Sequence, residues 1–179
     1  IVGLAGLGGH GQTTTLLHLF AESSSRWLPS AHKQMAFVAG DRALNGTFPL
    51  WSILRNLSIG NLASFARHAA VDTGREVAHG EDWKAKMGIR TPDMGNPILS
   101  LSGGNQQKVL FARALAGDAQ IVLMDDPMRG VDIGTKQEVY ATLRREAAEG
   151  RTFIWYSTEM DEVRLCDRVY VFRDGIIVA

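Results

Sequence analysis

The segment LSGGNQQKV, which runs from Leu101 to Val109, decides how the rest of this sequence is interpreted. Ser102 is a favourable helix N-cap, and the residues after it have the apolar spacing of a helix. Two glycines follow the serine, and amides at a helix N-terminus favour anionic groups such as phosphate. The alternative is a plain capping serine followed by two glycines. The segment therefore predicts a helix that begins near Ser102 and a candidate phosphate contact at its start.

A glycine-rich loop lies at the start of the chain, between the apolar run 1–5 and a helical pattern from about Thr13 to Ala21. It matches the phosphate-loop pattern G-x-x-x-x-G-K-[ST], except that Gln12 stands in the lysine position. Glycines allow successive amides to point inward at a polyphosphate, and the Thr13 hydroxyl can contact Mg²⁺. A purely structural turn is the alternative. The expected binding residues are Gly6, Gly8, Gly9, His10, Gly11, Gln12, Thr13 and Thr14.

The neutral side chain of Gln12 changes what this loop can contribute to binding. A charge-assisted hydrogen bond contributes about 1.5–3 kcal/mol, whereas a neutral one contributes about 1 kcal/mol. We therefore expect phosphate binding at this loop to be weakened and not abolished.

Two aspartates, Asp125 and Asp126, follow the apolar run from Ile121 to Met124 and precede Pro127. A carboxylate at the end of a buried strand can hold Mg²⁺ through water, which is the role expected for Asp125 alongside Thr13. Asp126 would then act as a base or orient the attacking water. The alternative is a pair of turn-forming aspartates before a proline.

The order of strands and helices predicts the fold class. Apolar runs alternate with helical patterns, which favours a mostly parallel α/β sheet. The turn at Asp174-Gly175 also allows an antiparallel last hairpin. We expect one domain over residues 1–179, with a mainly helical insert at about 43–118. The expected strands are 1–5, 35–38, 121–124, 152–156 and 168–172, and the expected helices after the insert are 134–148 and 161–166; residues 23–25 form a polar loop.

Composition excludes several classes of protein. Lysine plus arginine number 19 and aspartate plus glutamate 19, so the chain lacks the basic excess typical of nucleic-acid binding. The single cysteine, Cys166, cannot form an internal disulfide, which suits a reducing compartment. No apolar run approaches the roughly 20 residues that span a bilayer. The chain begins and ends in apolar runs without an initial methionine, which favours a segment of a longer protein.

The histidines do not predict a metal site. They show no paired spacing with cysteines or carboxylates, so we expect no zinc. His10 lies inside the glycine loop, where proximity to a phosphate ligand is expected without a chemical role. The five positions are His10, His18, His32, His68 and His79.

Together these segments resemble the ATP-binding-cassette (ABC) ATPases over essentially the whole chain. The glycine loop, LSGGNQQKV, the strand-end aspartates and Val131-Asp132 follow one another in the family's order. The resemblance implies a P-loop NTPase fold of the ABC type that binds ATP and Mg²⁺. It also implies a signature segment made of Ser102, Gly103, Gly104, Asn105 and Gln106, and a D-loop at Asp132.

Four further segments are similar to the second cassette of the ribose, galactose and xylose importers: Asp41-Arg42, Asn105–Lys108, Arg129–Lys136 and Tyr156–Met160. This resemblance implies an ATPase domain of a monosaccharide importer at the cytoplasmic face of the membrane. The implied partners are a second cassette paired head to tail, a membrane-spanning permease and, indirectly, a periplasmic sugar-binding protein. The permease would dock on the stretch 43–99, where Pro49, Leu50 and Trp51 belong either to that surface or to the core.

The chain departs from the family pattern at four positions of one site. Gln12 replaces lysine or arginine, and Gly40 replaces the glutamine or glutamate that senses the metal. Asp126 replaces the catalytic glutamate, and Thr158 replaces the switch histidine. These departures predict a weakly active site of the chain's own, at which Asp126 and Thr158 are the candidate catalytic residues. Two alternatives stay open: a catalytically silent module that completes a partner's ATP site, and a cassette ATPase without a transporter.

Overall fold

The computed structural model describes residues 1–23, 35–67 and 70–179, so His32, His68, Ser24 and Ser25 lie outside the described residues. Two compact units are present. We call Ile1–Gly40, Asp118–Arg129 and Arg144–Ala179 the strand unit, and Asp41–Gly117 and Gly130–Leu143 the helical unit.

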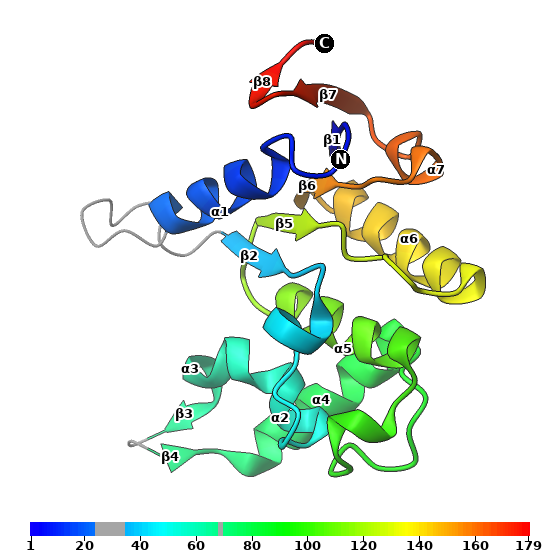
Figure 1. Cartoon of the computed structure of the whole chain (residues 1–179). Coiled ribbons are helices and arrows are strands. Elements are labelled where there is room, and N and C mark those ends of the chain that lie inside the picture. Colours follow the sequence, from blue (N-terminus) through cyan, green and yellow to red (C-terminus); the bar gives the residue numbers. More distant parts are fainter. Residues whose placement is uncertain (24–34, 68–69) are drawn as a thin grey trace. The chain divides into compact units, whose positions relative to one another are not determined.

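A six-stranded sheet forms the strand unit, with the order β2-β5-β6-β1-β7-β8 (Figure 1). All neighbouring strands are parallel except β7 and β8, which form an antiparallel hairpin, so the expected mostly parallel sheet is confirmed. The strands are β1 (Val2–Ala5), β2 (Met35–Val38), β5 (Ile121–Asp125), β6 (Thr152–Tyr156), β7 (Arg168–Arg173) and β8 (Ile176–Ile177).

Helices and apolar side chains complete the strand unit. α1 (Gln12–Ser23) packs on β5 and β2, and the short α7 (Met160–Val163) lies beside β1. α6 (Ile133–Ala148) has its last residues in this unit. Buried apolar side chains such as Leu4, Leu16 and Leu123 form the core, which agrees with unbroken apolar strands covered by helices. Because β1, β6 and β5 are parallel, their carboxyl ends meet at one sheet edge.

The helical unit packs α2 and α4 against α5. Sequence patterns indicated helices here, and the structure adds a short antiparallel pair, β3 and β4. Its elements are η1 (Arg42–Gly46), α2 (Ile53–Ser58), η2 (Ile59–Asn61), α3 (Leu62–Phe65), β3 (Ala66–Arg67), β4 (Ala70–Val71), α4 (Thr73–Met87), η3 (Ile98–Ser100) and α5 (Gly103–Leu115). In the part of the chain that the structure describes, no helix is long and apolar enough to cross a membrane.

Candidate nucleotide site

The glycine loop joins β1 to α1 in the strand unit. Gly6, Gly9 and Gly11 all have positive φ angles, of 135°, 85° and 101°. A Cβ at Gly6 would lie only 2.5 Å from the carbonyl oxygen of Phe172, so this position accepts no side chain. Gly8 and Gly9 are exposed, as is Thr14 in the first turn of α1. The loop therefore has the open, glycine-dependent curl that can surround a phosphate group.

Gln12 turns its side chain into the loop instead of towards solvent. The residue is 1% exposed, and its Nε2 donates to the carbonyl oxygens of Ala5 and Leu7, at 3.3 Å each. Both donor hydrogens of the amide are thereby directed at the loop's own backbone. Gln12 thus braces the loop and supplies no charge to a bound phosphate.

His10 joins the same loop to the turn between β7 and β8. Its Nδ1 accepts a hydrogen bond from the backbone N–H of Asp174 at 2.9 Å, and its carbonyl accepts one from Gly175 at 3.2 Å. An acceptor at Nδ1 places the proton of the neutral ring on Nε2. His10 therefore has a structural role in holding the loop, which sequence reasoning did not indicate.

Thr13 and Asp125 meet at the sheet edge. The Thr13 hydroxyl donates to Oδ1 of Asp125 at 2.6 Å, although 112 residues separate them. Mg²⁺ prefers hard oxygen ligands and keeps several waters, so one hydroxyl and one carboxylate beside a phosphate loop fit its needs. The described residues contain no group of three or more His, Cys, Asp or Glu side chains that could hold a metal by themselves.

Asp126 and Thr158 form the second contact at this edge. The backbone of Asp126 has a positive φ of 46°, and its amide donates to the carbonyl of Tyr156 at 2.8 Å. Its carboxylate accepts the Thr158 hydroxyl at 3.1 Å and the Thr158 amide at 3.5 Å. Burial raises the pKa of Asp126, and the bonds from Thr158 oppose that rise. The carboxylate is therefore already engaged on the protein side.

The segment that carries Thr158 is supported by a buried pair that the sequence did not reveal. Ser157 donates its hydroxyl to Oε2 of Glu162 at 2.5 Å and accepts the amide of Glu159 at 3.0 Å. Ser157 is 2% exposed and Glu162 is 1% exposed. Their spacing of five residues at the start of a short helix carries no recognisable motif.

Gly40 lies against the backbone of Asp125 in the strand unit. A Cβ at this position would lie 2.2 Å from the carbonyl oxygen of Asp125, which is well inside any permitted contact. The metal-sensing side chain expected at this point in related cassettes is therefore not only missing but sterically excluded by the backbone.

The signature segment and Asp132 both lie in the helical unit. Ser102 caps α5 with its backbone extended, and its Oγ accepts the amide of Asn105 at 3.4 Å. Gln106 donates its side-chain amide to the carbonyl of Leu101 at 2.9 Å. The exposed Asp132 accepts the amide and the hydroxyl of Thr135, at 2.9 and 2.8 Å, and these bonds lower its pKa.

The structure therefore places the predicted residues in two sets. The glycine loop, Thr13, Asp125, Asp126 and Thr158 come together in the strand unit. Ser102, Gly103, Gly104, Asn105, Gln106 and Asp132 belong to the helical unit, where a Cβ at Gly104 would lie 3.2 Å from Oδ2 of Asp132.

Comparison with known protein families shows which family the chain belongs to. The model of the family described as "ABC transporter" matches residues 1–129, which include the phosphate loop, the signature and both aspartates. The chain belongs to the ABC transporter family. The matched range ends at residue 129, before Asp132 and Thr158.

Solved cassettes have the same fold. A dimeric ATP-binding cassette in a post-hydrolysis state, bound to ADP and Pi, matches with a TM-score of 0.82 and 20% identity over 100% of this chain and 83% of that one. A bacterial Atm1-family ABC exporter with ATP bound matches with a TM-score of 0.76 and 21% identity, over 99% of this chain and 32% of that one. The cassette fold expected from the sequence is confirmed.

Curated relatives are closer in sequence. The cassette is 37% identical to the ribose import ATP-binding protein RbsA 1 of Rhizobium johnstonii, over 99% of the chain and 38% of the relative. It is 30% identical to the L-arabinose transport ATP-binding protein AraG of Geobacillus stearothermophilus, again over 99% of the chain and 38% of the relative. The chain thus spans about two-fifths of the length of these relatives.

Proposed function

We propose that this cassette binds Mg-ATP and powers a monosaccharide importer as one half of a head-to-tail pair. The names of its relatives, which import ribose or transport arabinose, support a sugar as cargo. The proposed partners are a second cassette, a membrane-spanning permease and a periplasmic sugar-binding protein, with the cassette at the cytoplasmic face of the membrane. The two-fifths of a relative's length that the chain spans leaves room for a second cassette in the same polypeptide.

The observation that carries this proposal is the contrast between a complete signature and an incomplete site of the chain's own. Ser102 is exposed at the start of α5, ready for a phosphate held by a partner's loop. At the chain's own loop, Gln12 is turned inward and Asp126 is held by Thr158. The pair is therefore asymmetric, with faster hydrolysis at the partner's phosphate loop.

The chain's own loop retains the means to bind nucleotide. The loop amides and the N-terminus of α1 would receive the phosphates, while Thr13 and, through water, Asp125 would hold Mg²⁺. A bound Mg²⁺ supplies charge neutralisation between the phosphate oxygens. Asp126 and Thr158 remain the candidate catalytic groups there, and Asp126 is the only one of the two that can accept a proton from water.

Four missing contributions explain why turnover at this loop should be slow. A loss of about 1.4 kcal/mol of transition-state stabilisation lowers a rate about tenfold, although such losses do not add simply. Gln12 lacks the positive charge, Gly40 lacks a side chain, and Thr158 lacks an ionisable ring. The fourth contribution is that of a glutamate, because Asp126 is one carbon shorter and its carboxylate already accepts a hydrogen bond from Thr158.

An exposed apolar surface in the helical unit supports docking to the permease. Leu50 is 96% exposed and Leu44 is 79% exposed, and Phe48, at 42%, stacks on Trp51 with ring centroids 4.6 Å apart. Exposed apolar side chains mark protein–protein contacts where they form a contiguous surface patch. We propose that residues 44–51 form part of the permease surface.

The proposal is tested by changing the signature segment and the glycine loop separately and measuring ATP hydrolysis by the assembled transporter. Ser102→Arg places a bulky side chain at the signature and is expected to abolish transport-coupled ATP hydrolysis. Gln12→Ala leaves the signature intact and is expected to lower transport-coupled hydrolysis far less. The reverse ranking would contradict the asymmetric pair. Nucleotide binding with no turnover at the chain's own loop would favour the silent module over a slow ATPase.

A further inference from the structure

The side-chain amide of Asn105 has only one orientation that its neighbours permit. The backbone N–H of Arg90 donates to Oδ1 of Asn105 at 2.9 Å, and a backbone N–H can only donate. The oxygen of the amide is therefore fixed on the Arg90 side. This leaves Nδ2 facing Ser102, where it donates to Oγ at 3.0 Å.

This orientation decides what the Ser102 hydroxyl can do. A serine oxygen has two lone pairs, and here Oγ accepts from Nδ2 of Asn105 and also from the Asn105 amide, at 3.4 Å. With both lone pairs directed at donors of the same residue, the hydroxyl hydrogen is left to point away from them. Since Ser102 is exposed, that hydrogen is available to an acceptor outside the chain, such as a phosphate oxygen.

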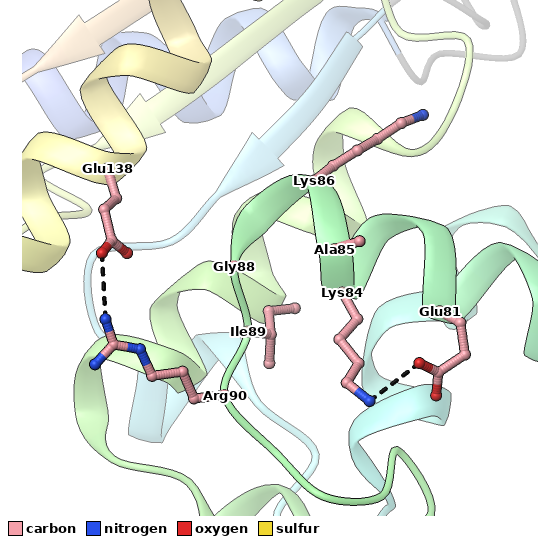
Figure 2. A pocket seen from close by; sticks show the side chains of 8 residues that line it. All are labelled: Glu81, Lys84, Ala85, Lys86, Gly88, Ile89, Arg90 and Glu138. Carbon is pink, nitrogen blue, oxygen red and sulfur yellow. Dashed lines mark hydrogen bonds and ion pairs between the residues drawn. The ribbon is translucent and has the colours of Figure 1, made fainter.

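The segment that orients Asn105 is itself clamped from two sides. Lys108, one turn further along α5, donates from Nζ to the carbonyl of Gly88 at 2.9 Å. Nζ also pairs with Glu138 of α6, and Lys108 is only 2% exposed. The guanidinium of Arg90 reaches the same Glu138 carboxylate at 3.4 Å (Figure 2). Residues 88–90 are thus held at Gly88 by Lys108 and at Arg90 by Asn105 and Glu138.

Arg90 and Glu138 line a pocket of about 590 Å³, which Figure 2 shows from close by. The Arg90 side chain is 80% exposed, so its ion pair contributes little. The backbone N–H of Arg90, and not its charged group, is therefore the part that acts on Asn105.

We propose that Asn105 is a positioning residue that turns the Ser102 hydroxyl outward as a hydrogen-bond donor to the γ-phosphate of ATP held by the partner cassette. The inference rests on the proposed function of the signature segment. In this role Asn105 acts through Ser102, because its Oδ1 accepts from the backbone of Arg90 while its Nδ2 donates to the Ser102 hydroxyl. The proposal therefore requires that the effect of Asn105 on hydrolysis depend on the presence of Ser102.

A double-mutant cycle on ATP turnover in the assembled transporter tests this dependence. Ser102→Ala is expected to lower kcat by about 10- to 100-fold, because it removes a donor aimed at developing charge. Asn105→Ala is expected to lower kcat by about 3- to 10-fold in the native background and to have no further effect beside Ser102→Ala. Independent effects that multiply in the double variant would overturn the proposal, since a structural role would persist without the serine.

Two further variants sharpen the test. Asn105→Asp has nearly the same shape but only acceptors, so it should draw the Ser102 proton inward and lower kcat more than Asn105→Ala. It also replaces Asn105→Ala in the cycle if that variant does not fold. Arg90→Ala keeps the backbone N–H and should leave kcat within about twofold; a loss equal to that of Asn105→Ala would contradict the assignment.

The failure of the inference is separable from the failure of the proposed function. If Ser102→Ala leaves turnover unchanged, the signature does not serve a partner's ATP and the proposed function is wrong. If Ser102→Ala lowers turnover but Asn105→Ala and Asn105→Asp do not, only the positioning role of Asn105 is wrong.

Discussion

The Thr158 hydroxyl donates to the Asp126 carboxylate at 3.1 Å, so two of the four positions at which the sequence differs from the expected cassette pattern contact each other directly. Threonine is both a donor and short enough to sit beside the backbone of residue 126. The contact engages one oxygen of the carboxylate that is proposed to accept a proton from the attacking water. The two residues are in direct contact, so their effects on the site are not expected to be independent.

The pH dependence of stability should reveal the half-buried Asp126 carboxylate. Burial raises the pKa of Asp126 above its ordinary value of 3.8, so between the two pKa values the folded state binds more protons than the unfolded state. This group's contribution to stability therefore falls as pH rises through that window and is flat above the folded pKa. Asp126→Asn removes the ionisation, so its Tm advantage over the native protein should grow with pH and then level off. A Tm difference that is constant from pH 4 to 8 would contradict this expectation.

Substitutions at Gln12 should separate two effects: the side chain's contribution to the stability of the loop and the effect of its missing charge on ATP binding. Gln12→Lys introduces a charge-assisted bond and is expected to tighten ATP binding at this loop by about tenfold. Gln12→Ala leaves the carbonyls of Ala5 and Leu7 without their donor and should destabilise the fold by about 1–3 kcal/mol. Calorimetric titration with ATP and urea unfolding measure the two effects. His18→Ala, at an exposed position of α1, is the control and should change neither.

Lys108 and Arg90 both pair with Glu138, and we expect the pair with the buried Lys108 to contribute more to stability. Glu138→Gln removes the charge that compensates Lys108 and should cost about 1–3 kcal/mol, discounted because the carboxylate is half exposed. Arg90→Gln breaks only an exposed ion pair and should cost less than about 0.5 kcal/mol. Urea unfolding of both variants checks the ranking, and equal losses would contradict it.

The Glu138 carboxylate should make the stability of the protein sensitive to acid. The hydrogen bond from Lys108 is the main cause that lowers the pKa of Glu138 below its ordinary value of 4.5. The stability it contributes is complete above that ordinary value and is lost as pH falls through the lowered pKa. Glu138→Gln should therefore destabilise the protein at pH 7 and have little effect near pH 2.

Gln107 offers a route to a more stable protein. Its side chain is fully buried in α5, and neither end of its amide finds a hydrogen-bond partner among the described residues. A buried polar group without a partner costs about 1–3 kcal/mol, which an apolar side chain of similar shape avoids. Gln107→Met should raise Tm by several degrees. A lower Tm would contradict the expectation that the unpartnered amide costs stability.

Most of the fold could be predicted from apolar runs and from the residues that cap helices or form turns. Ile121–Met124 was recognisable as a strand because an unbroken apolar run suits a strand covered on both faces, and Ser102 was recognisable as a cap. The contact between Thr158 and Asp126 was not, because it joins residues 32 apart without any periodic pattern.

Side-chain directions at the site were also hidden from the sequence. The type of residue at position 12 showed the loss of charge, but not that the amide turns inward to Ala5 and Leu7. Arg90 was missed because its role depends on a backbone N–H, which every residue except proline possesses. Asp132 was recognisable only through family resemblance, and its bonds to Thr135 needed coordinates.

Gly40 has a consequence for how this cassette can change over time. A Cβ there would meet the carbonyl oxygen of Asp125 at 2.2 Å, so Gly40→Ala should destabilise the protein by about 1–3 kcal/mol, measurable by urea unfolding, whereas Gly134→Ala should be nearly neutral. A mutation that returned glutamine to position 40 would incur the same clash before it restored any activity. The absence of a side chain at position 40 is therefore difficult to reverse in a single step, and under the proposed pairing a lineage that carries this backbone would depend on its partner for rapid turnover.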